Sequence, residues 1–582
     1  MKYENKLRRQ DYHGINGNVS LDRRSEFVQS PNRYDLSLGS DKSASSRNGT
    51  TTYDVFEAER NNQENIINNN TMVSSPTSIG STQTNGNNGT LDRNTDTYKK
   101  KWPTDKAYFL SKEILMTERT YKRDLDVINS RFRKMLGPED VENLQPLFDY
   151  FDSMVQHHSI FLRDLEHRIV VWENRGEETH RIGDVMLKNM VVLPIYEEYV
   201  EVHREILQRL NDLFTSDDRF QQIYKEFEQE KACYLPICFF LLKPLHRLLH
   251  YQTLMELLLE YYSDENMDKT DVQGALVMLS RTNETIREAI NESENFVLLC
   301  EIQRDLSGFD SLVQDERKLI RQGCLLKHSR RGLQQRMFFL FTDVLIYASK
   351  PQFLQTFKVL GHVPVRSLLT ENSEHNSFVI FGGGISITVS AGTTFEKNLW
   401  MEELQKAATS LKYRTPQLQT TFNGMKCCTS SEEGLEMCGL NVMTPTSVKA
   451  PTSRNNTALH VCWHRGVTIS LDDHIKSSEN HISGYLLRKF KNSSGWQKLW
   501  VVLTQFCLFF YKSYNDEIPL ASLPLLGYSV GPPDVQDAVQ KDFVFKLSFK
   551  NHTYFFRAES EISYERWLDN LKGICNQKYI RS

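Results

Sequence analysis

The chain has 582 residues, a formal net charge of −4 and an isoelectric point near 6.5. This length allows three or four domains, and without a basic excess there is no reason to expect a nucleic-acid partner. The first residues lack the apolar core of a signal peptide, no apolar run is long enough to cross a bilayer, and the ten cysteines show no metal-ligand spacing. We therefore expect a cytoplasmic protein with reduced thiols, without a cofactor and without a bound metal.

Residues 1–101 are rich in Asn, Ser, Thr and Gly and poor in aliphatic side chains. Such a segment cannot bury enough apolar surface to offset a chain entropy of about 1–2 kcal/mol per residue. The sequence predicts that this region is disordered.

The composition changes at Trp102, and residues 102–308 show helical periodicity almost throughout. Thr104 or Asp105 can cap the first helix, which carries a stripe of apolar residues from Leu110 to Ile128. Further helical patterns cover 141–172, 180–213, 217–230, 232–262 and 268–303. Six long helices separated by short polar breaks predict an all-α bundle.

The string CFFLLKPLHRLLHYQTLMELLLEYY, residues 238–262, is apolar on one helical face and half apolar on the other. A helix with this pattern packs on nearly all sides, so we expect it in the middle of the bundle. Pro244 removes one backbone donor and is expected to bend this helix or to mark its first turn.

From about residue 318 the apolar period changes to that of strands, and the layout then occurs twice. One unit covers 318–412 and the other 481–576, each ending in a helix with a tryptophan. The linker between them, 413–480, is rich in Ser, Thr and Pro. Its piece ALHVCWHRGVTISL, 458–471, is apolar enough that we expect it to dock on a neighbouring domain.

Several strings resemble a known family. LLKPLHRLLHYQTLMELL resembles the third conserved region of Dbl-homology (DH) domains, and the two strand-rich units resemble pleckstrin-homology (PH) domains. KAYFLSKEILMTERTYKRDLDVI, HVCWHRGVTIS and GWQKLWVVLTQFCLFFYKSYNDEIPLASLPLLGYS are similar to the FARP proteins, the FERM, RhoGEF and pleckstrin-domain family. The expected fold is a disordered N-terminus, an all-α DH bundle and two PH domains, each a seven-stranded β-sandwich or barrel with a C-terminal helix.

The FERM domain of that family has no counterpart in the sequence, and a truncated isoform, a partial gene model and a loss of the domain all remain open explanations. Membrane and receptor targeting by a FERM domain is therefore not carried over to this chain.

The resemblance implies a guanine-nucleotide exchange factor without covalent chemistry. Such a factor binds the nucleotide-free form of a Rho-family GTPase more tightly than the loaded form, and each 1.4 kcal/mol of that difference speeds GDP release about tenfold. We expect a Rac-like or Cdc42-like partner and autoinhibition by the PH domains folding back on the DH surface. The alternative is a DH–PH–PH scaffold that binds a GTPase or anionic membrane without exchanging nucleotide.

Three positions match the contact residues of the family: Glu118 in TERTY, His250 in LLHYQ and Asn291 in REAINES. From spacing alone, Glu118 and Asn291 would be interpreted as solvated helix residues. Many active DH domains carry Lys in place of His250, and a neutral imidazole lacks that fixed charge. The resemblance also implies that Arg247 is an internal brace.

Basic residues near the first hairpin of each strand-rich unit could attract anionic lipid, although such residues are about as often plain solvated surface. They are Lys327, Arg330, Arg331 and Arg336 in the first unit, and Arg488, Lys489, Lys491 and Lys498 in the second. In both units other residues interrupt the usual basic pattern of a lipid-binding hairpin. The sequence therefore predicts a weak attraction to anionic lipid without stereospecificity, roughly 1 kcal/mol per well-placed charge. We expect peripheral recruitment to membranes on this basis.

A His250→Lys variant is expected to exchange nucleotide faster than the parent, because a fixed cation would restore a close ion pair with the GTPase, worth several kcal/mol. The measurement is release of fluorescent GDP by a purified fragment of residues 100–310. Equal or slower release by the variant would contradict the role assigned to position 250.

Overall fold

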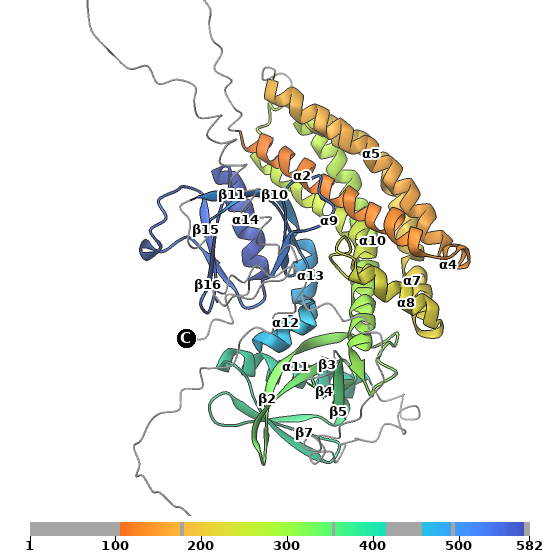
Figure 1. Ribbon diagram of the computed structural model, residues 1–582, viewed down its shortest axis with the longest axis vertical. Coiled ribbons are helices and arrows are strands. Elements are labelled where there is room, and N and C mark those ends of the chain that lie inside the picture. The colour runs from red at the N-terminus through yellow and green to blue at the C-terminus, as the bar shows by residue number, and fades with distance from the viewer. Residues whose placement is uncertain (1–104, 175–179, 352–355, 415–456, 490–494, 576–582) are drawn as a thin grey trace, which may run out of the picture. The chain divides into compact units, whose positions relative to one another are not determined.

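The computed structural model describes residues 105–174, 180–351, 356–414, 457–489 and 495–575 (Figure 1). The expected disorder of residues 1–101, most of the linker ahead of residue 457, and Lys491 lie outside the described residues. No helix in the described part of the chain combines the length and the apolar character needed to cross a membrane.

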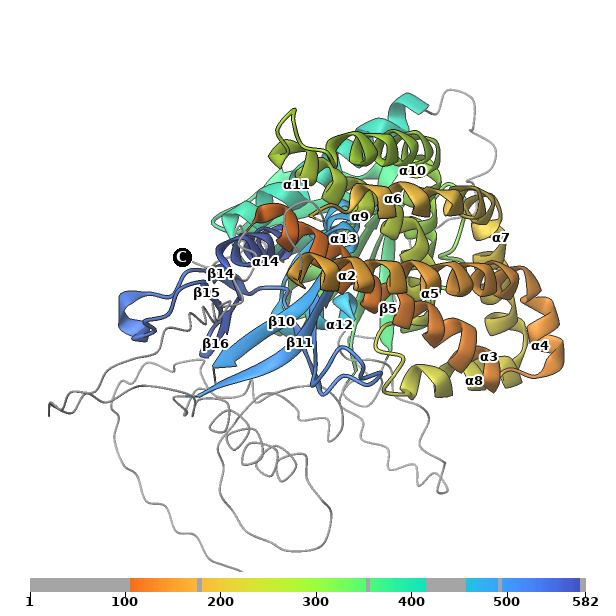
Figure 2. The same ribbon diagram turned by 90° about the horizontal axis from the view of Figure 1, so that it is seen from above.

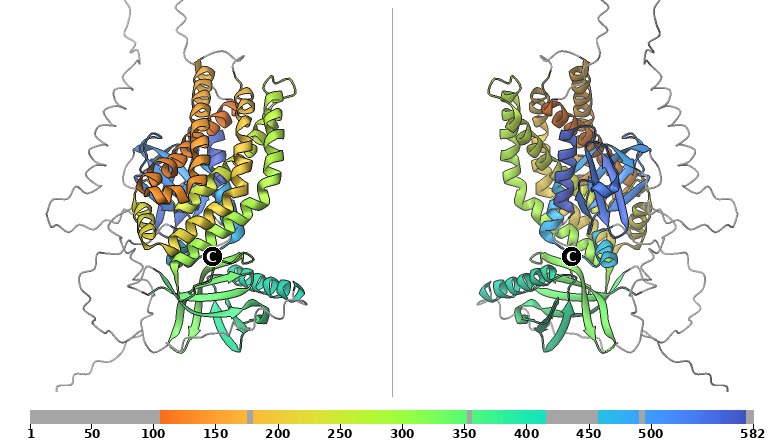
Figure 3. Two further views of the ribbon diagram at one scale, coloured as in Figure 1. Left: turned by 90° about the vertical axis from the view of Figure 1, so that its right-hand side faces the viewer. Right: turned by 90° about the vertical axis from the view of Figure 1, so that its left-hand side faces the viewer.

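The first described region is a bundle of helices, which we call the helical bundle (Figures 1 and 3). Its α-helices are α2 (Lys106–Asp126), α3 (Arg133–Met135), α4 (Pro138–Asn143), α5 (Gln145–Asn174), α6 (Gly183–Asn189), α7 (Leu193–Ser216), α8 (Asp218–Gln229), α9 (Ile237–Tyr261) and α10 (Lys269–Asp305). A π-helical stretch η1 (Val127–Phe132) joins α2 to α3, and a 3₁₀ turn η3 (Met190–Val192) joins α6 to α7.

Local chemistry explains where these helices begin and end. Asp105 caps α2 by accepting from the backbone N–H of Ala107 at 3.3 Å, so the expected cap is confirmed. The predicted helix at 180–213 is wrong as a single element, because Pro194 occupies the first turn of a new helix, α7. The predicted helix at 232–262 similarly begins later than expected, because α9 starts only after Pro236. Pro244 lies inside α9.

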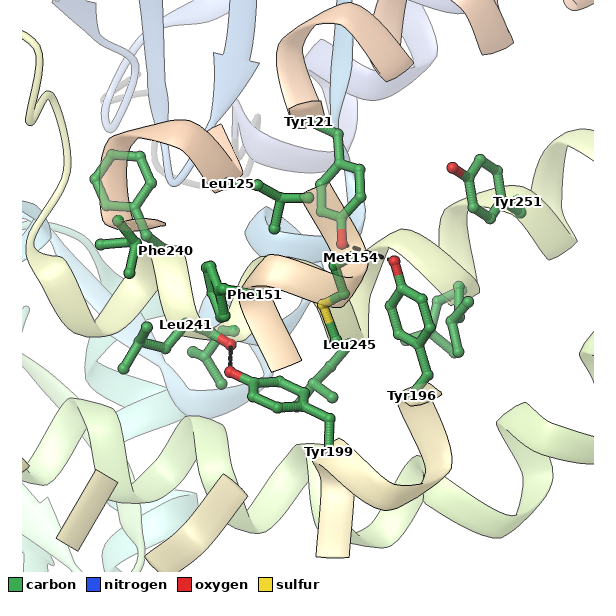
Figure 4. Close-up of a cluster of buried hydrophobic side chains, with 14 of the residues drawn as sticks. Tyr121, Leu125, Phe151, Met154, Tyr196, Tyr199, Phe240, Leu241, Leu245 and Tyr251 are labelled. Atoms are coloured by element: carbon green, nitrogen blue, oxygen red, sulfur yellow. Dashed lines mark hydrogen bonds between the residues drawn. The ribbon is translucent and has the colours of Figure 1, made fainter. Parts of the chain in front are cut away.

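Aromatic side chains fill the middle of the bundle, where several of them also make hydrogen bonds (Figure 4). The hydroxyls of Tyr121 and Tyr196 are 2.7 Å apart, and that of Tyr199 donates to the backbone carbonyl of Leu241 at 2.8 Å. Buried tyrosines are tolerated only when their hydroxyls find partners, so these bonds help to fix how α2, α7 and α9 lie against one another.

Two strand-rich units follow the bundle (Figures 1 and 2). The first strand unit consists of β2 (Leu319–Ser329), β3 (Gly332–Phe341), β4 (Val344–Ser349), β5 (Phe357–Pro364), β6 (Leu369–Asn372), β7 (Ser377–Gly382), β8 (Ile385–Ser390) and the helix α11 (Thr394–Arg414). The second strand unit consists of β10 (Ile482–Lys489), β11 (Trp496–Thr504), β12 (Cys507–Tyr511), β13 (Ala521–Pro524), β14 (Ser529–Gly531), β15 (Val544–Phe549), β16 (His552–Arg557) and the helix α14 (Glu561–Ile574). Short 3₁₀ turns, η4 (Val365–Ser367) and η6 (Val535–Asp537), lie between strands.

The two units share one strand order. In each, the seven strands are hydrogen-bonded in the order fourth, third, second, first, seventh, sixth, fifth. Each closing helix carries a buried tryptophan, Trp400 in α11 and Trp567 in α14, and the Trp400 ring lies against Phe338 of β3. The internal repeat expected from the sequence is therefore present in the described residues.

The linker segment, which we define as residues 458–479, docks on the first strand unit as expected. It comprises α12 (Ala458–Arg465), β9 (Thr468–Ser470) and α13 (Leu471–Glu479). Strand β9 pairs antiparallel with β2, and a short strand β1 (Leu306–Ser307) pairs with β5 on the far edge. The nine-stranded sheet that results ties the linker segment to the first unit.

Gly323 of β2 pairs with Thr468 of β9 without room for a side chain, because a Cβ atom there would lie only 2.4 Å from Thr468 Cα. We expect Gly323→Ala to separate β9 from β2, at a cost of roughly 1–3 kcal/mol for overpacking. Trypsin should then cleave the variant after Arg465 about tenfold faster than it cleaves the parent. The rate of cleavage is measured by mass spectrometry of the digest.

The matched control for this change is Gly531→Ala in β14, where an added Cβ meets nothing within 4 Å. Cleavage of the control should match that of the parent. Unchanged cleavage of Gly323→Ala would show that the linker segment is held by other contacts.

Candidate functional site

The carboxylate of Glu118 lies inside the helical bundle and is fully buried. One oxygen accepts from Arg247 Nη2 at 2.8 Å and from the Tyr251 hydroxyl, and the other lies 2.7 Å from His158 Nδ1. A GTPase could reach this carboxylate only by breaking these bonds. The expectation that Glu118 lies on a docking surface is therefore wrong, and its role in this structure is to hold Arg247 in the core.

The pKa of Glu118 reflects these partners. Burial alone would raise it, but the positive charges of His158 and Arg247 and the hydrogen bonds from His158 and Tyr251 outweigh burial and lower the pKa to about 2. The side chain is consequently ionised at neutral pH. Arg247, itself almost fully buried, is the internal brace that the sequence resemblance implied.

Glu113 of α2 faces away from the bundle core, toward Arg566 of the second strand unit. It precedes Glu118 by five residues, which turns it by about 140° around the helix axis. One of its carboxylate oxygens lies 3.9 Å from Nε2 of His250. Glu113 was not among the site residues predicted from the sequence, although its spacing of i, i+7 to Thr120 places the two on a shared helix face.

His250 lies beside Glu113 and is 7% exposed. Its Nδ1 accepts a hydrogen bond from Arg247 Nη1 at 2.8 Å, so this nitrogen carries no proton. Burial, together with the positive charges of Arg247, His481 and Arg566, lowers the pKa of His250 well below its ordinary value. The imidazole is thus neutral in this arrangement.

Asn291 is exposed on α10, which packs along α9. It follows Arg287 by one helical turn, and Arg287 lies 4.0 Å from Glu479 of α13. Of the three residues predicted from the sequence, His250 and Asn291 thus lie on neighbouring helices of the bundle, and Glu118 lies in its interior.

The outward sides of α2 and α9 form what we call the α2–α9 face, made of Lys112, Glu113, Thr120, Arg123, Lys243, His246 and His250. The second strand unit covers this face. Arg566 of α14 donates to both carboxylate oxygens of Glu113 at 2.9 and 3.0 Å, and Lys112 pairs with Glu559 at 2.7 Å.

Packing adds to these polar contacts. The hydroxyls of Thr120 and Ser483 are hydrogen-bonded at 2.8 Å, and the guanidinium of Arg123 lies 4.3 Å from the ring centroid of Tyr511. Phe509 contacts Tyr234 with ring centroids 4.6 Å apart, so β12 continues the apolar core of the bundle. The face is therefore occupied within the chain itself.

The basic residues expected to attract lipid fall into different environments. The prediction that Arg488 binds lipid is wrong, because Arg488 is 3% exposed and its guanidinium lies against the rings of Phe510 and Tyr554. Three of the other basic residues are half-buried, namely Lys327, Arg336 and Lys489. Three are exposed, namely Arg330, Arg331 and Lys498. Arg330 and Arg331 form the tip of the hairpin between β2 and β3.

A RhoGEF domain model matches residues 110–287, and a PH domain model matches residues 480–576. FERM, ARHGEF and pleckstrin domain-containing protein 2 of Mus musculus is 42% identical over 501 residues, covering 83% of this chain and 47% of that protein. The chicken (Gallus gallus) protein 1 of the same name is 41% identical over 495 residues, covering 82% and 47%.

Among solved structures, the DH domain of FARP2 is 38% identical, with a TM-score of 0.33, covering 35% of this chain and 98% of that structure. The chain thus spans about half the length of the curated relatives that it matches.

A Glu118→Gln variant is expected to lose about 3–5 kcal/mol of stability, because the change leaves the Arg247 guanidinium buried without its counter-charge. The measurement is urea unfolding followed by far-ultraviolet circular dichroism. The control is Glu166→Gln, which removes a partly exposed ion pair with Arg119 and should cost less than about 1 kcal/mol.

The pH dependence tests the same pair. A carboxylate with a pKa near 2 in the folded state stabilises the fold above its ordinary pKa of 4.5 and loses that contribution as the pH falls toward 2. The stability difference between parent and Glu118→Gln should accordingly shrink below about pH 5. A difference that stays constant with pH would show that the charge of Glu118 is not what stabilises the bundle.

Proposed function

The close homologues of this chain are the FERM, ARHGEF and pleckstrin domain-containing proteins, the FARP family, and on this premise we propose that it is a guanine-nucleotide exchange factor. Its substrate would be a Rho-family GTPase of the Rac or Cdc42 type. The RhoGEF domain match over most of the helical bundle supports the activity.

The proposed domain order is a DH domain over 102–308 and PH domains over 318–412 and 481–576. The PH model matches the second strand unit, and the first unit repeats its strand order and its closing helix. This repetition supports a second PH domain, since unrelated sheets would not be expected to share both features.

The proposed GTPase-binding surface consists of Glu113, His250 and Asn291. Glu113 replaces the buried Glu118 in this role, because its carboxylate turns outward beside His250. A carboxylate at this place can accept backbone hydrogen bonds from a switch segment of the GTPase. These bonds would compete with those that keep the segment ordered around the magnesium ion and the phosphates. The exchange factor acts by binding the nucleotide-free GTPase more tightly than the loaded form.

The observation that carries the regulatory part of the proposal is the ion pair between Arg566 and Glu113. It places α14 of the second strand unit on the residue that we assign to the GTPase. A GTPase and the second unit cannot occupy the α2–α9 face together, and this overlap supports autoinhibition of the exchange factor. Activation then requires the second unit to move away.

We further propose cytoplasmic localisation with peripheral recruitment to anionic membrane. The exposed Arg330 and Arg331 at the tip of the β2–β3 hairpin support this, with Leu333 beside them 58% exposed. Two arginines and one leucine supply a weak, non-stereospecific attraction of about 1 kcal/mol per charge.

A second candidate function is a scaffold that binds a GTPase or membrane without exchanging nucleotide. The neutral, buried state of His250 favours it, because no fixed charge stands at that position. The two functions differ in whether GDP is released once the α2–α9 face is free.

An Arg566→Glu variant of the full chain should release GDP from its GTPase at least about tenfold faster than the parent. The change places two carboxylates opposite each other and removes a close ion pair worth about 2–5 kcal/mol, and each 1.4 kcal/mol favours opening tenfold. Fluorescent-GDP release from Rac, Cdc42 and RhoA measures the rate and the selectivity.

The matched control is Lys541→Glu, which reverses an exposed charge in the loop ahead of β15 of the second strand unit. It should release GDP at the parent rate. Deletion of residues 318–582 should activate release as well. If the chain without residues 318–582 releases GDP but Arg566→Glu does not speed release, occlusion of the α2–α9 face is refuted. If neither variant releases GDP, the scaffold function is favoured.

A further inference from the structure

A small cavity of about 30 Å³ lies where α2 and α9 meet the segment that leads into β10. Three histidines line it: His246 and His250 from α9, and His481 just ahead of β10. Asp124, Lys243 and Arg247 line it too. A cluster of titratable side chains thus surrounds the cavity, at the boundary between the helical bundle and the second strand unit.

His250 tolerates no second proton in this arrangement. Its Nδ1 accepts from Arg247, whose guanidinium can only donate, and a proton on that nitrogen would place two donors against each other. Among the described residues, Nε2 meets no hydrogen-bond partner, and the Glu113 carboxylate that lies 3.9 Å away is already bound by Arg566.

His481 faces mostly cations. From α9 it faces Lys243 and Arg247, from α2 Arg123, and its ring lies edge-on to that of His250 with centroids 5.8 Å apart. The backbone of Leu503 in β11 accepts a hydrogen bond from its ring.

The acidic side chain in this cluster, Asp124, is already bound by Lys243 at 2.7 Å and by the hydroxyl of Tyr234 at 2.8 Å. A charged imidazole at position 481 would therefore be repelled by its neighbours.

We propose that His481 makes contact between the second strand unit and the α2–α9 face dependent on pH, so that acidification opens this contact. The proposal rests on the closed arrangement argued above, although it does not require that the chain exchanges nucleotide. When the second unit moves away, His481 leaves Lys243, Arg247 and Arg123 and is hydrated, whereas His250 keeps Arg247 on its own helix.

The sign follows from linkage between proton binding and opening. Burial, followed by the charges of Lys243 and Arg247, lowers the pKa of His481 well below 6.5 in the closed state. An open state with an ordinary pKa of 6.5 binds the proton more readily, so falling pH favours opening. For one histidine this shift raises the open-to-closed ratio about fourfold between about pH 7.5 and about pH 6.

His246 is a poorer candidate, because its Nε2 lies 2.8 Å from a carboxylate oxygen of Glu294 on α10. Both residues belong to the helical bundle, so His246 keeps this partner when the second strand unit moves away. The pH response is thereby assigned to His481.

The experiment follows opening without using GDP release. A cysteine introduced as Thr120→Cys lies under Ser483 and becomes accessible to an alkylating reagent only when the second unit moves away. Its alkylation rate in the full chain is read by mass spectrometry on its own peptide and divided by the rate for the urea-unfolded chain at the same pH. We expect this ratio to rise about fourfold from about pH 7.5 to about pH 6.

The variants decide which residue is responsible. In the Thr120→Cys background, His481→Gln should abolish the rise, whereas His167→Gln, on the exposed side of α5, should retain it. His481→Arg should give a high ratio at both pH values, because its charge is fixed.

A flat ratio in the parent, a retained rise in His481→Gln, or a low ratio for His481→Arg at about pH 7.5 would each overturn the proposal. Because none of these measurements involves a GTPase, a chain that fails to exchange nucleotide still tests it.

Discussion

The buried pair of Glu118 and Arg247 is the interaction on which the candidate site depends. It joins α2 to α9 in the core, and the additional bonds of Glu118 to His158 and Tyr251 bring in α5 and a second turn of α9. An ion pair without water must keep its geometry, because any displacement leaves a bare charge in a medium of low dielectric. With Glu118 held inward, the helix geometry turns Glu113 outward beside His250.

The outward face is closed by contacts of a different kind. The ion pair of Lys112 with Glu559 is partly exposed, and pairs of this type contribute about 0–1 kcal/mol where solvent reaches them. The rings of Phe509 and Tyr511 supply apolar packing against Tyr234 and Arg123. The bundle core is thus held more firmly than its cover, which is consistent with the proposal that the second strand unit moves away from the α2–α9 face.

Some elements could be predicted from the sequence because their signals are local. The pattern of residues 238–262 identified the central helix α9, and Asp105 marked the start of α2. The strand layout that occurs twice, each time ending in a helix with a tryptophan, indicated the two strand units. Strands of three or four residues, such as β6, β13 and β14, show no period in the sequence from which they could be predicted. Arg488 was misassigned because a basic residue on a strand gives no sign of which side its ring neighbours occupy.

The sequence by itself determined the kinds of elements, their order and the family that the chain resembles, because periodicity, capping and turn chemistry act over a few residues. Only the tertiary structure decided which of Glu113 and Glu118 faces outward, and that the second strand unit lies on the α2–α9 face. The physical reason is that rotation of a helix about its own axis, and the pairing of residues more than four hundred positions apart, are set by packing between elements and leave no local pattern.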